Sequence, residues 1–465
     1  MVLNIYIIFL ISKKINYLSN LDSFQIAGGY SSPWSMYYLT YFILALLFAL
    51  IIIFLLRLKF ELKIKFLTAI ISVGFTIFAF ELFLTISHQK YNIETKIENA
   101  KKFGIEFDSR STLNVLETLN QNKKKVYPNF KPKFFLVEDF YLKEGFQTIN
   151  NDNIFPLSNI SNISTILTNE NGYYPIVKTD KYGFTNENNF YNNVDIMIVG
   201  DSYAEGYSVK QEDSIHSNLN NAGYNAISLG KGGNGPIVEL ASLIEYGKPY
   251  KPPVVIWIFV HNDFRNLHFE LRSNLLTNYL INPNYEQNLI NKQNEIDDFL
   301  IKYIDSETKE LKQNKIVSKF NFLNLDTIIE IIKFSKLRSY VINTLMYLNT
   351  DNNYKILDQV LTRANNEVES WGGKLYFVYL PSLQTLNNTS LENVNNNSKI
   401  NVRDGKSTIQ DIHKICAKLN IEVIDFHYEI NKMGNYKSIF PMESDGHYNT
   451  KGYKLLTETL IKNLK

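Results

Sequence analysis

Two long apolar runs within the first ninety residues constrain this chain most strongly. Tyr38–Leu56 carries no charged residue, and Phe66–Ile86 carries only Glu81. A bilayer core is spanned by about 20 apolar residues in helical form, and soluble helices of that length normally keep a polar face. We therefore predict a membrane anchor over residues 1–90, with two transmembrane helices at about 38–56 and 66–86. The alternative is a pair of core helices in a soluble domain.

The segment between the two runs indicates the orientation of the anchor. Arg57, Lys59, Lys63 and Lys65 crowd this turn and are opposed only by Glu61. Positively charged loops stay in the cytoplasm. The sequence thus predicts a hairpin in the cell (inner) membrane, multi-pass, with the rest of the chain on the extracytoplasmic side.

The opening stretch Asn4–Ile11 is apolar but too short to cross a bilayer, and no small-residue cleavage pattern follows it. We interpret it as an interfacial segment. Insertion of Met1–Ser12 would instead leave the bulk of the chain in the cytoplasm, so this alternative stays open.

Composition excludes several classes of protein. The chain has 465 residues, 45% of them hydrophobic, which is enough for a packed core and for two or more structural regions. The formal net charge is +2, and no large cluster of Lys and Arg suggests a nucleic-acid partner. Cys416 is the only cysteine, so an intramolecular disulfide and a Cys-rich zinc site are both excluded. No cofactor and no metal is predicted.

From about residue 194 to the C-terminus, short apolar runs alternate with helical patterns. Such alternation predicts an α/β domain built on a doubly wound parallel sheet. The segment 91–193 is a polar, Asn-rich lead-in, and Asn169–Gly183 within it is dense in turn signals. Residues at about 264–352 form an insertion with helical spacing, too long for a plain connection. The expected strands are Ile196–Val199, Ala226–Leu229, Val254–Val260, Lys374–Leu380 and Glu422–Phe426, and the expected helices are Ser214–Ala222, Ile237–Tyr246, Ile356–Trp371, Ile409–Leu419 and Lys451–Leu464.

Four short polar blocks follow these strands or precede the last helix. In a doubly wound sheet, ligands bind beyond the carboxyl ends of the strands, so the blocks are expected at one rim. They are Gly200-Asp201-Ser202-Tyr203, Gly230-Lys231-Gly232-Gly233-Asn234-Gly235, His261-Asn262-Asp263 and Asp445-Gly446-His447-Tyr448-Asn449.

The blocks contain the parts of an acyl-transfer site. Ser202 lies where a strand turns into a helix, and His447 supplies the base that a serine nucleophile needs. Asp445, the nearest carboxylate in sequence, is expected to orient His447. The backbone N–H groups of Ser202 and Gly233 and the amide of Asn262 are candidates for an oxyanion hole, in which each donor contributes about 3 kcal/mol to transition-state stabilisation.

The blocks resemble those of the SGNH/GDSL hydrolase superfamily, whose named residues are Ser, Gly, Asn and His in that chain order. Here they match Ser202, Gly233, Asn262 and His447. The resemblance covers about residue 195 to the C-terminus. It implies a flavodoxin-like SGNH fold and a membrane-anchored esterase or O-acyltransferase, acting outside the cytoplasm on acyl (most often O-acetyl) esters of a glycan or lipid.

Two positions depart from the family pattern. Many members carry Asp three residues before the histidine, where this chain has Ser444, and the spacing of Asp445 instead resembles the SGNH-like alginate O-acetyltransferases. His261 stands where Gly is common, and it is the one histidine that competes with His447 for the role of base. His216, His413 and His427 are expected to be structural.

Two other functions fit the same residues. A catalytically inactive, membrane-anchored scaffold or glycan-binding protein would keep the fold without turnover. A metal phosphoesterase would use Asp201, His261, Asp263 and His447 as ligands, but a serine nucleophile is superfluous in such a site. The sequence does not distinguish hydrolysis from transfer, because both reactions pass through the same acyl-enzyme.

Overall fold

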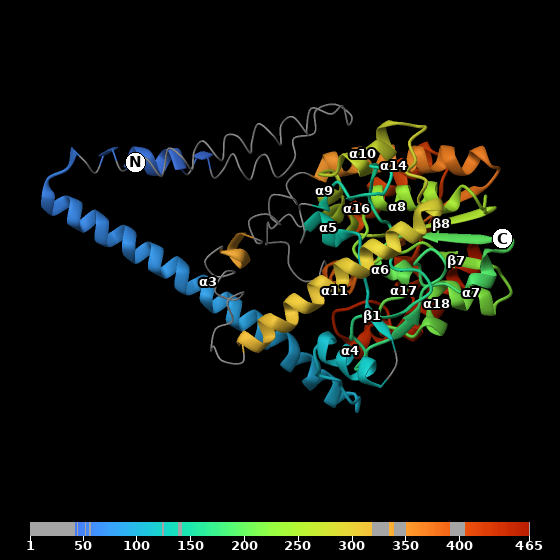
Figure 1. Ribbon diagram of the computed structural model, residues 1–465, viewed down its shortest axis with the longest axis horizontal. Coiled ribbons are helices and arrows are strands. Elements are labelled where there is room, and N and C mark those ends of the chain that lie inside the picture. The colour runs from blue at the N-terminus through green and yellow to red at the C-terminus, as the bar shows by residue number, and fades with distance from the viewer. Residues whose placement is uncertain are drawn as a thin grey trace. The chain divides into compact units, whose positions relative to one another are not determined.

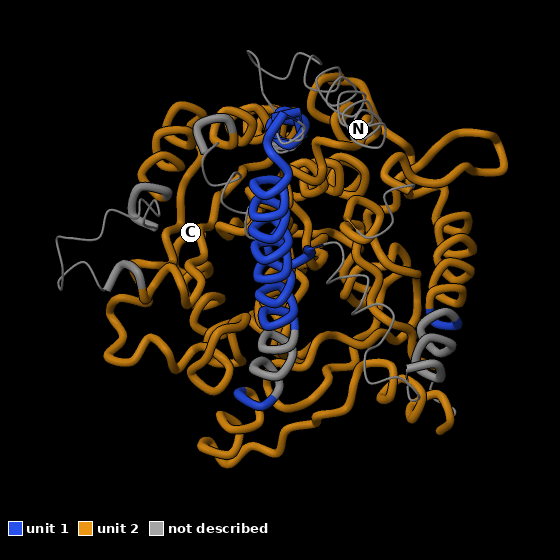
Figure 2. Tube along the Cα trace, turned by 90° about the vertical axis from the view of Figure 1, so that its left-hand side faces the viewer, with its two compact units in different colours: residues 1–95, 308–352 blue, residues 96–307, 353–465 orange. Residues whose placement is uncertain are grey.

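The computed structural model describes residues 42–43, 45–51, 53–54, 57–122, 125–137, 142–318, 334–338, 350–390 and 405–464. The chain divides into two compact units (Figure 2): residues 1–95 with 308–352, and residues 96–307 with 353–465. The lead-in segment therefore belongs, from residue 96, to the same unit as the sheet, whereas the sequence suggested a separate region. The insertion at 264–352 is divided between the two units.

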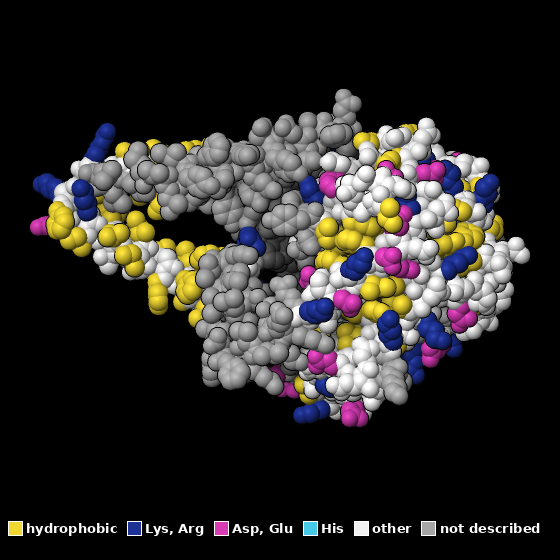
Figure 3. All heavy atoms as spheres, viewed as in Figure 1, with side chains coloured by type: hydrophobic (Ala, Val, Ile, Leu, Met, Phe, Trp, Pro, Cys, Tyr) yellow, Lys and Arg dark blue, Asp and Glu magenta, His cyan; other side chains and the backbone are white. Residues whose placement is uncertain are grey.

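Helix α3 runs over Phe60–Lys102, well past the expected end at residue 86, and belongs to the first unit up to Thr95. Its segment Phe60–Thr85 is long and apolar enough to cross a membrane, and it is the one such helix in the described part of the chain. Its hydrophobic side chains are exposed rather than packed in a core, and Lys and Arg gather near its amino end (Figure 3).

The predicted hairpin is described only in part. Within the first predicted span, residues 42–43, 45–51 and 53–54 are helical, and the remainder of 38–56 lies outside the described residues, as does the stretch at 1–12. One expectation is corrected: Lys63 and Lys65 lie within the first turns of α3, since the helix begins at Phe60. The basic turn is thus shorter than the sequence suggested.

Glu81, the single acidic residue of the second apolar run, is fully buried. Its Oε1 accepts a hydrogen bond from the backbone N–H of Lys336 at 2.7 Å, and its Oε2 accepts one from that of Leu337 at 3.0 Å. One turn away, the rings of Phe78 and Phe334 contact edge to face. A carboxylate on an apolar helix needs such partners. The carboxylate therefore binds a segment of the insertion.

The second unit is built on a five-stranded parallel sheet of order β10-β9-β8-β6-β7 (Figure 1). The predicted parallel sheet is confirmed, and all five strands lie within one residue of their expected bounds. They are β6 Ile196–Val199, β7 Ala226–Ser228, β8 Val254–Val260, β9 Lys374–Leu380 and β10 Glu422–Asp425.

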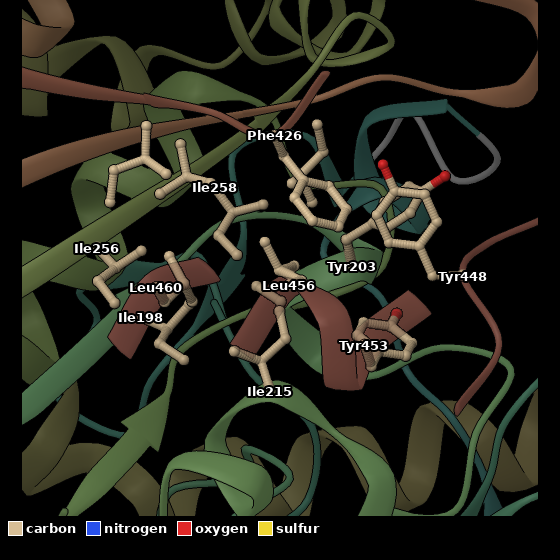
Figure 4. Close-up of a cluster of buried hydrophobic side chains, with 14 of the residues drawn as sticks. Ile198, Tyr203, Ile215, Ile256, Ile258, Phe426, Tyr448, Tyr453, Leu456 and Leu460 are labelled. Carbon is tan, nitrogen blue, oxygen red and sulfur yellow. The ribbon is translucent and has the colours of Figure 1, made fainter. Parts of the chain in front are cut away.

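Helices cover both faces of the sheet because successive strand side chains point in opposite directions. On one face, Ile198, Ile256 and Ile258 pack with Ile215 and with Leu456 and Leu460 of the last helix (Figure 4). Each such side chain contributes about 1.5–3 kcal/mol on burial. The covering helices are α7 Ile215–Asn221, α8 Pro236–Ser242, α14 Thr350–Ser370, α16 Gly405–Lys418 and α18 Thr450–Asn463. Helices α7 and α18 lie within one residue of the predicted ranges, whereas α8 ends four residues early, where a π-helical turn follows, and α14 and α16 begin six and four residues early.

On the opposite face, Phe259 of β8 packs between Phe264 and Phe377, with ring centroids 5.1 and 5.5 Å away. Phe264 in turn contacts Tyr354 of α14. The chain order of the strands reverses at β6, which pairs with both β7 and β8. The carboxyl ends of β6 and β8 thus flank the point at which ligands bind in sheets of this kind.

The lead-in and the insertion add smaller elements to this unit. The lead-in forms a three-stranded sheet of order β1-β4-β5 and a two-stranded sheet, β2-β3. The described part of the insertion is mainly helical, as predicted, with a loop at 282–288. The elements are α4 Thr112–Gln121, β1 Val126–Pro128, α5 Lys133–Val137, β2 Phe146–Gln147, β3 Asn153–Ile154, β4 Ser164–Ile166, β5 Ile176–Lys178, α6 Ser202–Glu205, α9 Asp263–Glu270, α10 Asn274–Ile281, α11 Gln293–Ser318, α15 Leu383–Ser390 and α17 Phe426–Asn431.

Candidate active site

Ser202 is the first residue of the short helix α6, directly after β6. Asp201 caps this helix, because its Oδ1 accepts the backbone N–H of Tyr203 at 2.9 Å. The turn from strand to helix places the Ser202 hydroxyl at the carboxyl edge of the sheet. The side chain is largely buried, with 7% of the residue exposed.

The contacts of the two residues that follow His447 fix its backbone position. Tyr448 is fully buried in the core, and its hydroxyl donates to the carbonyl of Pro381 at 2.7 Å (Figure 4). Asn449 caps α18 by accepting the N–H of Gly452. The imidazole ring itself lies against two aromatic rings, 4.7 Å from that of Tyr203 and 5.1 Å from that of Tyr207. These two ring contacts limit the orientations that the imidazole can adopt.

The predicted nucleophile and base meet. Nε2 of His447 lies 2.7 Å from Oγ of Ser202, although 245 residues separate them in sequence. This distance is within hydrogen-bond reach for proton transfer from the hydroxyl. His261, the competing histidine, is half-buried next to Phe264 instead. The geometry selects His447.

The carboxylate at the other side of the imidazole is Glu170, from the lead-in segment. Nδ1 of His447 lies 2.9 and 3.0 Å from the two carboxylate oxygens, and the backbone N–H of His447 donates to Oε2 at 2.8 Å. The hydroxyl of Ser208 donates a short hydrogen bond to the same oxygen. Glu170 thus has the position of the third member of a serine–histidine–carboxylate triad.

The role expected of Asp445 is therefore corrected. Its side chain is exposed, and its Oδ2 accepts a hydrogen bond from Gln384 at 3.1 Å. Although Asp445 is only two residues from His447, the intervening turn directs the two side chains apart. The position that we assigned to Asp445 is occupied by Glu170.

The loop that carries Glu170 is the Asn-Glu-Asn-Gly stretch, for which the sequence predicts a turn but no function. Asn169 is buried, donates to the carbonyl of Asp108 and accepts the N–H of Gly172. Asn171 donates to the carbonyl of Ser208. These bonds fix the turn on both sides of Glu170. A single sequence offers no signal that separates this carboxylate from the others in the chain.

The charges of the pair stabilise each other. Burial acts to raise the pKa of Glu170, but the charge of His447 and hydrogen bonds from His447 and Ser208 outweigh it and lower this pKa to about 2. For His447, burial opposes protonation, while Glu170 favours it more strongly, so the pKa of His447 is raised above its usual 6.5. Glu170 therefore remains ionised and supports an imidazolium.

Asn262 and Gly233, the predicted oxyanion donors, lie at the same edge as Ser202. Asn262 follows β8, and its Nδ2 donates to Oδ2 of Asp201 at 3.1 Å. An amide nitrogen carries two N–H donors, so this bond orients the group while leaving a second donor. Oδ2 of Asp201 also lies 3.2 Å from Oγ of Ser202. Asp201 therefore fixes the amide beside the nucleophile.

The loop Gly230–Gly235, called the glycine loop from here on, requires glycine at position 233. Gly233 has φ +81°, a left-handed conformation that favours residues without Cβ, and an added Cβ would come within 2.7 Å of Cδ of Lys133. The end of the loop is held by Glu270, which accepts the N–H groups of Gly235 and Ile237 at 2.6 and 2.9 Å. Burial outweighs these bonds and raises the pKa of Glu270 to about 7.

A buried ion pair is hydrogen-bonded to the same loop. Lys231 and Glu205 have fully buried side chains and form a short salt bridge. Oε2 of Glu205 accepts the N–H of Gly232 at 2.6 Å, and Lys231 also donates to Oδ1 of Asn129 at 2.8 Å. This network joins α6, the glycine loop and the lead-in segment.

Within the ranges that the structure describes, no group of three or more His, Cys, Asp or Glu side chains is arranged to hold a metal ion. Comparisons of the sequence with known protein families and with curated proteins find no significant match.

Proposed function

We propose that this chain is an SGNH-type serine hydrolase or O-acyltransferase that cleaves or transfers O-acyl esters, O-acetyl esters foremost. The observation that carries the proposal is the row of contacts Ser202–His447–Glu170, with a hydrogen-bond distance on each side of the imidazole. The strand order, β7-β6-β8-β9-β10 when read from one edge, is that of flavodoxin-like sheets and supports the SGNH fold.

The residues act in sequence. His447 takes the proton of Ser202 as Oγ attacks the ester carbonyl, and Glu170 stabilises the imidazolium that forms. The N–H groups of Ser202 and Gly233 and the amide of Asn262 stabilise the oxyanion. His447 then protonates the leaving alcohol, and an acyl group remains on Oγ. Water releases it as an acid, and a hydroxyl of a second glycan accepts it in a transfer.

A fluorophosphonate probe tests the nucleophile. The purified full-length protein should be labelled covalently, and labelling should be lost in Ser202→Ala and strongly slowed in His447→Ala, because the probe reacts only with an activated serine. Ser370→Ala, which changes an exposed serine at the end of α14, serves as a control that must retain labelling. Labelling that survives in Ser202→Ala would reject the proposed nucleophile, and no labelling of the wild type would favour the inactive scaffold or glycan-binding protein.

An acceptor assay separates hydrolysis from transfer. Acetate release from an acetyl ester should be measured with and without an oligosaccharide, and the oligosaccharide should be analysed for acetylation. A fall in acetate release that matches new acetyl ester on the oligosaccharide indicates an acyltransferase. Unchanged release indicates an esterase.

We further propose that a hairpin in the cell membrane carries the catalytic domain on the extracytoplasmic side. The exposed apolar side chains of α3 and the basic residues at its amino end support this location. Alkaline phosphatase fused after Lys465 should be active in intact cells, because it folds only outside the cytoplasm. An inactive phosphatase with a fluorescent cytoplasmic reporter at the same position would contradict this topology.

A further inference from the structure

Two lysines of the lead-in segment lie against the proposed catalytic residues. Nζ of Lys131 is 5.1 Å from the centroid of the Tyr207 ring, and this ring contacts the imidazole of His447. The stem of Lys133 covers the open side of Gly233. Both lysines therefore border the space next to the nucleophile.

The position of Lys133 is fixed by polar contacts. Its Nζ donates to Oδ1 of Asn266 at 2.9 Å, and Nδ2 of Asn266 donates to the carbonyl of Asn234 at 2.8 Å. Nζ also lies 5.7 Å from the centroid of the Phe269 ring. The ammonium group is thus tied to the glycine loop that is proposed to bind the oxyanion.

Lys131 is half-buried, and among the described residues it forms no ion pair with a carboxylate. Its neighbours there are the rings of Tyr207 and Phe134, the latter at 5.9 Å. This positive charge acts to lower the pKa of His447, against the effect of Glu170. His447 becomes positively charged when it takes the proton of Ser202, so a nearby cation opposes that step. A negative charge brought by the substrate would remove that cost.

We propose that Lys131, with Lys133 beside it, forms a subsite for a negatively charged group of the substrate, and that the substrate is an O-acylated acidic saccharide. This inference rests on the proposed function. Ammonium groups bind carboxylates as point charges, and the half-buried ring of Phe134, 5.9 Å from Nζ of Lys131, offers apolar surface to a sugar ring. The carboxylate of the sugar would lie at Lys131 while its acyl ester lies at Ser202.

Matched ester pairs test the subsite in the full-length protein. The substrates are the O-acetylated methyl glycoside of glucuronic acid and its uncharged methyl ester, and the quantity measured is the ratio of their kcat/KM values. In the wild type this ratio should favour the charged sugar and fall as NaCl screens the charges. Lys131→Met should lower the ratio about 10-fold or more, because a hydrogen bond between charged groups is lost.

Lys374→Met is the matched control. Lys374 also lies over a tyrosine ring, 4.4 Å from the centroid of that of Tyr376, but at the amino end of β9 and so at the opposite edge of the sheet. Its replacement should leave the ratio unchanged. An equal loss on both esters in Lys131→Met, with an unchanged ratio, would mean that Lys131 acts on the oxyanion and would overturn the proposal, as would a wild type without preference.

A binding measurement separates this proposal from the proposed function. Calorimetric titration of the Ser202→Ala protein with the two sugars requires no turnover. Tighter binding of the charged sugar that is lost in Ser202→Ala/Lys131→Met supports the subsite, even if the wild type cleaves neither ester and takes no fluorophosphonate. Equal affinity for both sugars overturns it, even if the wild type is an active esterase.

Discussion

Replacing Glu170 with glutamine should lower kcat for ester hydrolysis by about 1,000- to 10,000-fold, while replacing Asp445 with asparagine should change it by less than about twofold. Glutamine keeps the shape of Glu170 but removes the charge that stabilises the imidazolium. Its amide also favours the tautomer of His447 in which Nε2 carries the proton and cannot accept one from Ser202. Asp445 contacts Gln384, so its replacement leaves the imidazole unaffected.

Turnover of 4-nitrophenyl acetate by purified protein measures both variants, with Ser202→Ala as the blank. Circular dichroism and retention of the thermal transition show that Glu170→Gln is folded. The opposite result, a large loss in Asp445→Asn and little in Glu170→Gln, would restore the assignment that sequence proximity suggested. It would also mean that the turn at 169–172 is displaced in solution.

The pH profile gives an independent readout of the same pair. Hydrolysis requires neutral His447, so kcat/KM should rise with pH through the pKa of His447, which Glu170 raises above 6.5. In Glu170→Gln that raising effect is absent, and the inflection of the residual activity should move to lower pH. Asp445→Asn should keep the wild-type inflection. An inflection that stays in place in Glu170→Gln would show that another group sets it.

Glu170 and Asp445 illustrate which residues of the site a sequence can and cannot reveal. Ser202 and His447 were predictable because each stands at the end of a recognisable element, and parallel strands bring such ends to one edge. Glu170 stands 277 residues before His447, in a turn of a polar segment without hydrophobic periodicity. Nearness in sequence pointed to Asp445, but a turn of two residues directs side chains apart as readily as together.

For a related reason, the sequence does not indicate that the lead-in segment belongs to the same unit as the sheet. Several of its contacts with the rest of the unit are hydrogen bonds between side chains: Asn129 donates to Glu205 at 3.0 Å and accepts from Lys231 at 2.8 Å. Hydrogen bonds between single side chains leave no period of 2 or 3.6 in the sequence. Apolar strands such as Val254–Val260 do leave one, so the sheet was predicted almost to the residue while its polar support was not.

Replacing Lys231 with methionine should reduce the free energy of unfolding by about 3–5 kcal/mol, because it leaves the carboxylate of Glu205 buried without its cation. The two side chains are fully buried, and the pKa of Lys231 is lowered because burial outweighs the opposing effect of Glu205. Lys374→Met removes a pair with Glu422 in which about half of each side chain is exposed. That change should cost less than about 1 kcal/mol.

Chemical unfolding of the full-length protein in detergent, followed by the fluorescence of buried Trp257, measures these values. The double variant Lys231→Met/Glu205→Gln should be more stable than the sum of the two single losses predicts, because no unpaired charge remains. Its glycine loop should nevertheless be less well positioned, since a glutamine oxygen binds the N–H of Gly232 more weakly than a carboxylate does. If the double variant recovers stability but not kcat, the ion pair serves to align the oxyanion donors. Full recovery of both would assign it to stability alone.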